Sequence, residues 1–191
     1  MKLILLGAPG AGKGTQAENI SGRYEIPTIS TGNMIRAAIH NGTELGKQAE
    51  SLINAGKLVP DEVVIGMIRE RLAEEDCKNG FILDGFPRTI PQAEALKKML
   101  ADRGHEMGMM IELVVEEDVL MARLLNRAIE QGRADDNEET IKKRFAVYHS
   151  QTAPLSEWFA QEGIRNTFAW SELGTKEGML EAIFKTIDEQ A

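Results

Sequence analysis

A glycine-rich run, GAPGAGKGTQ from Gly7 to Gln16, directly follows the apolar stretch from Leu3 to Leu6. Four of its residues are glycines, which lack a Cβ, so the backbone can curl tightly and direct successive amide groups inward at an anion. The helix expected to begin near Lys13 adds the positive end of its dipole, and the lysine adds a full charge. This order of strand, loop and helix predicts an α/β protein with a phosphate site.

The hydroxyl group that follows the lysine is displaced by one place. In the general pattern Ser or Thr comes directly after the lysine and ligates magnesium, whereas here Gly14 intervenes before Thr15. The sequence therefore supports direct metal ligation by Thr15 less strongly than a standard loop would. The alternative interpretation is a plain glycine turn with Lys13 on the surface, but the flanking strand and helix favour a phosphate loop.

Composition restricts the class of protein. The chain of 191 residues suits one α/β domain with insertions. Its formal net charge is -8, which disfavours nucleic acid or an anionic membrane as partner. The single cysteine, Cys77, excludes an intramolecular disulfide and a multi-cysteine zinc site. The apolar run at the start of the sequence is too short for a signal peptide or a membrane span. We expect a soluble cytoplasmic monomer.

Short apolar runs alternate with helical patterns along the chain, which predicts a parallel sheet wrapped by helices. The five expected strands are Leu3 to Leu6, Pro27 to Ile29, Phe81 to Leu83, Met110 to Val115 and Ile164 to Phe168.

Two excursions leave this pattern. A helical stretch from Thr31 to Glu75 is interrupted at Asn41-Gly42, Gly56 and Pro60. This stretch is too long for a single crossover helix between two strands, so we predict a helical insertion, residues 30–60, over the cleft. The core then comprises residues 1–29, 61–127 and 138–191.

The second excursion is polar and turn-rich, and we expect it to form a short mobile flap over residues 128–137. It separates a helix expected at Glu117 to Arg127 from a long helix expected from Glu138 to about Ala160. The acidic cluster from Asp135 to Glu139 is interpreted as a solvated helix start, where carboxylates suit the helix dipole.

Asp84 ends the apolar run in FILDGFPRT, and the chain then turns through Gly85 and Pro87 to Arg88. Ligands of open α/β sheets lie at the carboxyl ends of strands, so Asp84 should face the same crevice as the phosphate loop. There it could hold magnesium through the water shell of the ion. The alternative is that Asp84 caps the helix beginning near Thr89.

Arginines supply the remaining chemistry. Arg123 and Arg127 lie four residues apart on one helical face, Arg133 lies in the flap and Arg144 in the following helix. Converging guanidinium groups could clamp a transferring phosphoryl group and offset its charge. Taken singly, each could equally form a solvent-exposed salt bridge.

Together these segments resemble the adenylate kinase family. GAPGAGKGTQ, STGNMIR, GKLVPDEVV, FILDGFPRT, RLLNR and GRADDNEETIKKR occur in the order and approximate spacing of that family, over nearly the whole chain. The resemblance implies reversible phosphoryl transfer from MgATP to AMP, giving two ADP. It also implies a five-stranded parallel core with an AMP-binding insertion and a short lid without zinc. Asn33 departs from the pattern, which has aspartate there, and puts a charge-dependent role at that position in doubt.

The resemblance also assigns residues. It implies contacts with ATP by Gly10, Ala11, Gly12, Lys13, Gly14, Thr15, Arg127 and Lys176. It implies contacts with AMP by Thr31, Arg36, Lys57, Leu58, Val59, Gly85, Phe86, Pro87, Arg88, Gln92, Arg133 and Arg144. The catalytic set would be Lys13, Arg88, Arg123, Arg133 and Arg144, with Mg²⁺ as the cofactor near Asp84.

The chemistry implied needs alignment, charge neutralisation and exclusion of water, with no general base. A related kinase acting on UMP or CMP is the nearest alternative; Thr31 favours adenine, because pyrimidine-selective relatives usually carry a smaller residue there. A nucleotide-dependent switch protein is a second alternative. It is disfavoured because the chain has no NKxD motif and a switch has no need of clustered arginines.

Overall fold

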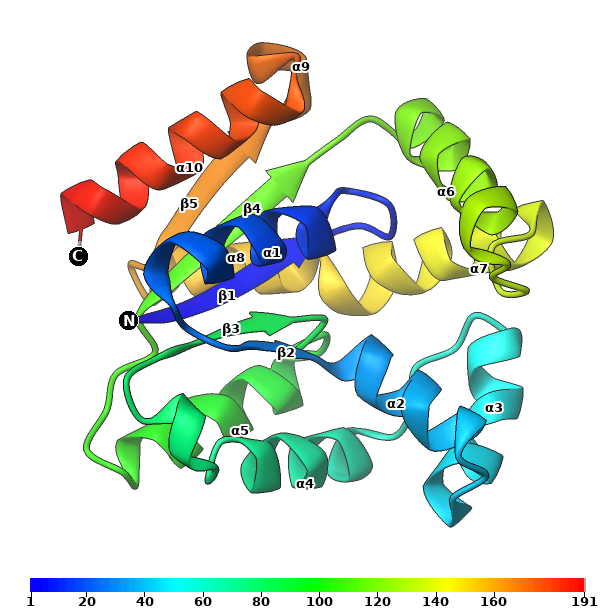
Figure 1. The fold of residues 1–191 in the computed structure, drawn as a ribbon, viewed down its shortest axis with the longest axis horizontal. Coiled ribbons are helices and arrows are strands. Elements are labelled where there is room, and N and C mark those ends of the chain that lie inside the picture. The colour runs from blue at the N-terminus through cyan, green and yellow to red at the C-terminus, as the bar shows by residue number, and fades with distance from the viewer. Residues whose placement is uncertain (191) are drawn as a thin grey trace.

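The computed structural model describes residues 1–190 and contains a five-stranded sheet in the order β2-β3-β1-β4-β5 (Figure 1). Every neighbouring pair of strands is parallel. The strands are β1 (Lys2–Gly7), β2 (Thr28–Ser30), β3 (Phe81–Asp84), β4 (Met109–Val114) and β5 (Arg165–Ala169). The predicted fold class is confirmed, and each strand lies within one or two residues of its expected position.

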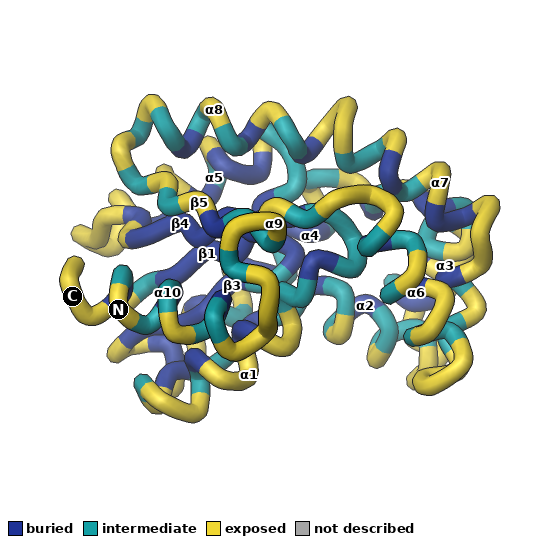
Figure 2. The backbone as a smooth tube through the Cα atoms, turned by 90° about the horizontal axis from the view of Figure 1, so that it is seen from above, coloured by how far each residue is buried: buried dark blue, intermediate teal, exposed yellow. Residues whose placement is uncertain are grey.

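Helices cover both faces of the sheet, so its central strands are buried (Figure 2). Ile4 and Leu6 of β1 point into one apolar cluster, and Leu3 and Leu5 point into the other, as the alternation of a strand requires. The first cluster is completed by α4 (Asp61–Arg71), α5 (Ile90–Ala101) and α8 (Pro154–Gln161). The second is completed by α1 (Lys13–Tyr24), α6 (Glu117–Gln131), α7 (Glu138–Val147) and α10 (Lys176–Gln190).

The segment after β2 forms α2 (Thr31–His40) and α3 (Glu44–Asn54) before α4. Side chains of Ser30 and Thr43 cap the first two helices by accepting from backbone amides one turn on. A Cβ on Gly46 would collide with the carbonyl of Ala38, so α2 and α3 approach as closely as they do only because this residue is glycine. The breaks between these helices fall where the sequence predicted them.

Two expectations about the flap and its flanking helices were wrong. The helix α6 continues to Gln131, through the first four flap residues, because alanine, glutamate and glutamine favour helix, and it ends at Gly132 with φ 61°. The expected long helix from Glu138 is broken into α7, a π-helical turn (Tyr148–Thr152) and α8. Pro154 begins α8, and its ring nitrogen cannot donate the hydrogen bond that a continuous helix needs.

Two short elements complete the described residues, a 3₁₀ turn (Glu75–Cys77) and α9 (Trp170–Leu173). Cys77 is buried, as a small apolar side chain would be. Among residues 1–190 no helix combines the length and the apolar character that crossing a bilayer requires.

Candidate active site

The glycine-rich loop lies between β1 and α1, at the carboxyl edge of the sheet (Figure 1). Gly10 and Gly12 have φ values of 86° and 98°, in the left-handed region that glycine adopts without strain. The Nζ atom of Lys13 donates hydrogen bonds to the carbonyl oxygens of Gly7 at 2.8 Å and Ala8 at 3.1 Å. The lysine therefore holds the loop in its curled form, with the amino end of α1 open to an anion.

The charge of Lys13 is shaped by its surroundings. Burial lowers the pKa of its ammonium group to about 8, the carboxylate of Asp84 opposes that shift, and the nearby guanidinium groups of Arg88 and Arg144 add to it. A phosphate group beside this lysine would supply the negative charge that the site lacks.

Asp84 ends β3 and faces this loop, as predicted. Its Oδ2 lies 3.9 Å from the place a Cβ of Gly14 would take, so the absence of that side chain leaves space beside the carboxylate. Thr89, and not Asp84, caps α5 by accepting from the amide of Gln92. The capping alternative for Asp84 is thus wrong, and its carboxylate accepts no side-chain hydrogen bond within residues 1–190.

A cleft opens between the phosphate loop, the insertion and α7. It is lined by eleven of the residues assigned from sequence: Lys13, Thr31, Arg36, Lys57, Leu58, Val59, Gly85, Pro87, Arg88, Gln92 and Arg144. Its remaining lining includes apolar side chains of Ile35, Ile53 and Val64 and the aromatic ring of Tyr148. An apolar wall with converging cations suits a ligand that joins a flat ring to phosphate.

The turn after β3 builds one side of the cleft. The carbonyl oxygen of Gly85 accepts from Thr31 Oγ1 at 2.7 Å and from Arg88 Nε at 2.8 Å. Gly85 has φ 80°, and a Cβ there would lie 2.9 Å from both Thr31 Oγ1 and a terminal guanidinium nitrogen of Arg88. The sequence requires glycine at this position to bring the hydroxyl and the arginine together.

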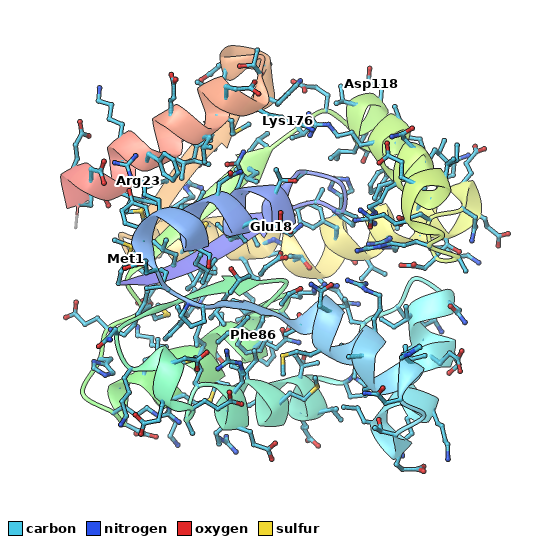
Figure 3. The ribbon with its side chains drawn as sticks, viewed as in Figure 1. Met1, Glu18, Arg23, Phe86, Asp118 and Lys176 are labelled. Atoms are coloured by element: carbon cyan, nitrogen blue, oxygen red, sulfur yellow. The ribbon has the colours of Figure 1, made fainter. Side chains whose placement is uncertain are left out.

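Phe86 does not belong to this surface. Its side chain is fully buried in the first apolar cluster, while its neighbours Gly85 and Pro87 line the cleft (Figure 3). The contact with AMP expected at Phe86 stays a prediction, and its backbone would have to make it, because the ring points into the core.

Asp61 is a site residue that the sequence analysis missed. Its Oδ1 accepts from Gln92 Nε2 at 2.8 Å and from Thr89 Oγ1 at 2.9 Å, while Gln92 Oε1 accepts from the amide of Arg88 at 2.8 Å. The buried amide of Gln92 is therefore fixed in orientation. No local signal reveals this role, because an acidic residue in the first turn of a helix is common for dipole reasons alone.

The acidic segment after α6 is not the solvated helix start that the sequence suggested. Asp136 is 1% exposed and accepts two hydrogen bonds from Arg127, from Nε at 2.6 Å and Nη2 at 2.8 Å, and one from Arg144 Nη1 at 2.7 Å. Asp135 also pairs with Arg144, at 3.4 Å. Only Glu138 and Glu139 match the expectation, since both are solvated and pair with lysines one turn on.

Burial raises the pKa of Asp136, but its hydrogen bond with Arg127 and the charges of Arg127 and Arg144 outweigh burial, so the net pKa lies below the usual range. This carboxylate stays ionised and joins the end of α6 to α7. The idea that Arg127 and Arg144 form solvent-exposed salt bridges is therefore wrong.

Arg36 and Arg133 complete the cationic group. Burial lowers the pKa of both guanidinium groups, and the charge of Arg36 lowers the pKa of Arg133 further, which shows that the insertion and the flap bring these charges near each other. Arg36 Nη2 donates to Asn33 Oδ1 at 2.8 Å. A neutral amide thus supports Arg36 where the family pattern has aspartate. Arg133 does not line the cleft.

On the other side of the loop, Arg123 Nη1 approaches the carbonyl oxygen of Gly10 at 3.5 Å, and the guanidinium carbon lies 4.2 Å from the centroid of the Trp170 ring. Lys176 is exposed at the start of α10, outside the cleft (Figure 3). The loop residues assigned to ATP other than Lys13 also lie outside the cleft lining.

A curled glycine loop between a buried strand and a helix, at the carboxyl edge of a parallel sheet and beside a cationic cleft, defines a phosphate-loop nucleotide-binding protein. The family model described as "Adenylate kinase" matches residues 5–164. The chain belongs to the adenylate kinase family, and the prediction that it is an enzyme of this family is confirmed.

Curated relatives span nearly the whole chain. A protein named "Adenylate kinase" from Bacteroides thetaiotaomicron is 50% identical over 189 residues, covering 99% of this chain and 99% of the relative. Another from Phocaeicola vulgatus is 56% identical over 163 residues, covering 85% and 86%. One from Caldicellulosiruptor saccharolyticus is 46% identical, covering 90% and 93%.

Proposed function

We propose that this chain catalyses reversible transfer of a phosphoryl group from MgATP to AMP, giving two ADP. One observation supports this proposal above the others: Lys13 of the phosphate loop and the three arginines Arg36, Arg88 and Arg144 line the same cleft. A donor phosphate on the loop would therefore face an acceptor phosphate held by arginines. The net charge of -8 and the lone buried Cys77 support a cytoplasmic monomer that acts on free nucleotides.

The proposed residue roles fall into two groups, one that binds ATP at the phosphate loop and one that binds AMP in the cleft. Gly10 to Thr15 would cradle the ATP phosphates. Arg127 would reach ATP from the last turns of α6, and Lys176 would contact the adenine base of ATP. On the AMP side, Arg36 and Arg88 would bind the phosphate and Gln92 the base, against Thr31, the segment Lys57 to Val59, and Gly85 with Pro87. Arg123, Arg133 and Arg144 would surround the transferring group.

We assign the moving parts to residues 30–60, the AMP-binding insertion, and residues 128–137, the lid. The insertion rests against α7, where Thr140 Oγ1 donates to the carbonyl of Asn54 at 3.4 Å and a Cβ on Gly56 would come within 3.1 Å of the carbonyl of Thr140. The ion pair of Asp136 with Arg144 ties the lid to the same helix, and its pair with Arg127 ties the lid to α6. Both flaps thus close over one cleft and exclude water from it.

The residues beside the loop fit magnesium. Asp84 offers a carboxylate free of side-chain partners within residues 1–190, Gly14 leaves space next to it, and Thr15 adds an exposed hydroxyl in the first turn of α1. Mg²⁺ keeps most of its water shell, so a single carboxylate acting through water suffices. When bound with ATP, the ion would neutralise phosphate charge. The short lid leaves no place for a zinc hairpin, and we propose none.

Within the closed cleft the reaction needs no general base. An oxygen of the AMP phosphate attacks the γ-phosphorus of ATP, and the bond between that phosphorus and the β,γ-bridging oxygen breaks. The bridging oxygen stays on the departing ADP. No proton has to be moved, because the attacking phosphate oxygen is already deprotonated. The arginines stabilise the charge that spreads over the transferring group, and they are already positioned before it arrives.

The decisive experiment measures ADP formed from MgATP with and without AMP. We expect rapid ADP formation with AMP and almost none without it; ADP formed at equal rates in both would contradict the proposal and indicate an ATPase or a switch. Replacing AMP by UMP, CMP or GMP tests the acceptor. A preference for UMP or CMP would replace our assignment by a pyrimidine nucleotide kinase.

A further inference from the structure

Arg123 and Trp170 form a pair that the proposed roles leave unexplained. Arg123 lies in α6, which follows β4, and Trp170 is the first residue of α9, which follows β5 (Figure 1). The 4.2 Å from guanidinium carbon to ring centroid is well within the range of a cation–π interaction, which is strongest with tryptophan. The pair therefore joins two helices above the carboxyl edge of the sheet.

The same guanidinium group is directed at the phosphate loop. Its Nη1 lies 3.5 Å from the carbonyl oxygen of Gly10. The loop is packed closely on α6 there, because a Cβ on Gly10 would lie 3.0 Å from Leu124 Cγ. Neither Arg123 nor Trp170 lines the cleft on the AMP side. In the strand order, β4 and β5 lie on the opposite side of β1 from β2 and β3. The pair thus belongs to the donor side of the loop.

Arg123 also differs from its neighbours in its partners. Arg127 and Arg144 both pair with Asp136, so a ligand must share them with a carboxylate. Arg123 forms no salt bridge within residues 1–190: the charge of Glu116 acts on it only at longer range, and its guanidinium group stacks on the ring of Trp170. An aromatic face orients a guanidinium group without neutralising it.

We propose that Trp170 is a positioning residue for the donor nucleotide. It holds Arg123 against the phosphate loop with its charge free, so that ATP meets a fixed cation and displaces no carboxylate. This inference rests on the proposed function, in which ATP binds at the loop. The half-buried ring also packs on the second apolar cluster, which limits its motion and that of the arginine above it.

Steady-state kinetics with each substrate varied separately tests the proposal. We expect Trp170→Ala to raise KM for MgATP about tenfold, in line with loss of a partly buried cation–π contact, while KM for AMP changes less than about twofold. Trp170→Phe, which keeps an aromatic face, should recover most of the ATP affinity. An unchanged KM for MgATP, an equal rise in both KM values, or a Phe variant as impaired as the Ala variant would overturn it.

Trp158 provides the control. It lies on α8, in edge contact with Phe159, and the nearest cation, Lys97, is 6.0 Å from its ring centroid. Trp158→Phe should leave both KM values unchanged. In that variant Trp170 is the one remaining tryptophan of the chain.

Fluorescence of the Trp158→Phe variant gives a second measurement that does not depend on Trp170→Ala folding. We expect MgATP to change the emission of Trp170 with saturation, and AMP alone to leave it unchanged. No response to MgATP, or an equal response to AMP, would overturn the proposal. If the wild-type chain still forms ADP from ATP and AMP, the proposed function stands whichever result is obtained here.

Discussion

Arg88 is the residue whose loss should most directly impair catalysis. Its side chain lines the cleft and is fixed by the carbonyl oxygen of Gly85. We expect Arg88→Ala to lower turnover at least about a hundredfold, the scale of removing one preorganised donor to the transition state. Arg23→Ala, which breaks an exposed ion pair with Asp188 far from the cleft, is the control. Steady-state turnover of Arg88→Ala equal to that of the wild type would refute the role.

Asp136 should matter for stability as well as for the site. Its folded-state pKa is depressed, so it stabilises the fold above the unfolded pKa, and this contribution is lost as the pH falls through the folded pKa. We expect Asp136→Asn to lower the free energy of unfolding by roughly 3 kcal/mol at pH 7, because two arginines lose a buried partner. The difference should shrink below about pH 4.

Urea unfolding of both proteins across that pH range measures the effect of Asp136→Asn. Glu139→Gln is the matched control, since Glu139 is solvated and its pair with Lys143 lies on the surface. A constant difference between wild type and Asp136→Asn at every pH would mean that the carboxylate charge is not what stabilises the flap.

The lowered pKa of Lys13 predicts that ATP binding is coupled to proton uptake. Because burial holds its pKa at about 8, part of the lysine is neutral above that pH in the free enzyme, and bound phosphate should restore the charge. ATP binding at pH 8.5 should therefore take up a proton, and ATP affinity should fall as the pH rises beyond 8. Calorimetry in two buffers of different ionisation enthalpy detects the uptake; identical heats in both buffers would disprove it.

At the scale of elements, the turn between β3 and α5 is a closely constrained piece of backbone in the cleft. Gly85→Ala would place a Cβ 2.9 Å from both Thr31 Oγ1 and Arg88 Nη2, at a φ that alanine rarely adopts. We expect a higher KM for AMP, a lower turnover, and a loss of about 1–3 kcal/mol in stability.

Gly66→Ala provides the comparison for Gly85→Ala. Gly66 lies within α4 and a Cβ there would meet no atom within 4 Å, so the substitution should stabilise the protein by about 0.5–1 kcal/mol. Thermal unfolding and kinetics of the two variants separate local strain from a general intolerance of larger residues. Equal behaviour of both would contradict the argument.

Local sequence predicted the elements well where one residue type dominates the choice. Apolar runs located the strands, and glycine or proline located the breaks at Gly42, Gly56 and Pro60. Local sequence was less successful where helix-favouring and turn-favouring residues occur together. α6 ends at Gln131 and not at Arg127, because the residues from Ala128 to Gln131 tolerate helix even though they begin a turn-rich stretch.

At the scale of the whole molecule, the proposed function requires two nucleotide sites in one closed cleft. A bisubstrate mimic, two adenosines bridged by five phosphates, should bind one to one and compete with both ATP and AMP. At a concentration 100 times its Kd it should stabilise the fold by about 2.7 kcal/mol. Calorimetry that shows competition with only one nucleotide would argue against paired sites.

The sequence alone determined the parallel α/β class and the phosphate loop, since glycine, lysine and apolar periodicity act through neighbouring backbone, and its family resemblance assigned eleven of the residues that line the cleft. Tertiary structure decided that Asp136 is buried between Arg127 and Arg144, that Asp61 fixes Gln92, and that Trp170 covers Arg123. These partners come from different elements. Burial and charge pairing depend on which segments meet in space, and a charged residue in a polar stretch carries no local sign of its eventual partner.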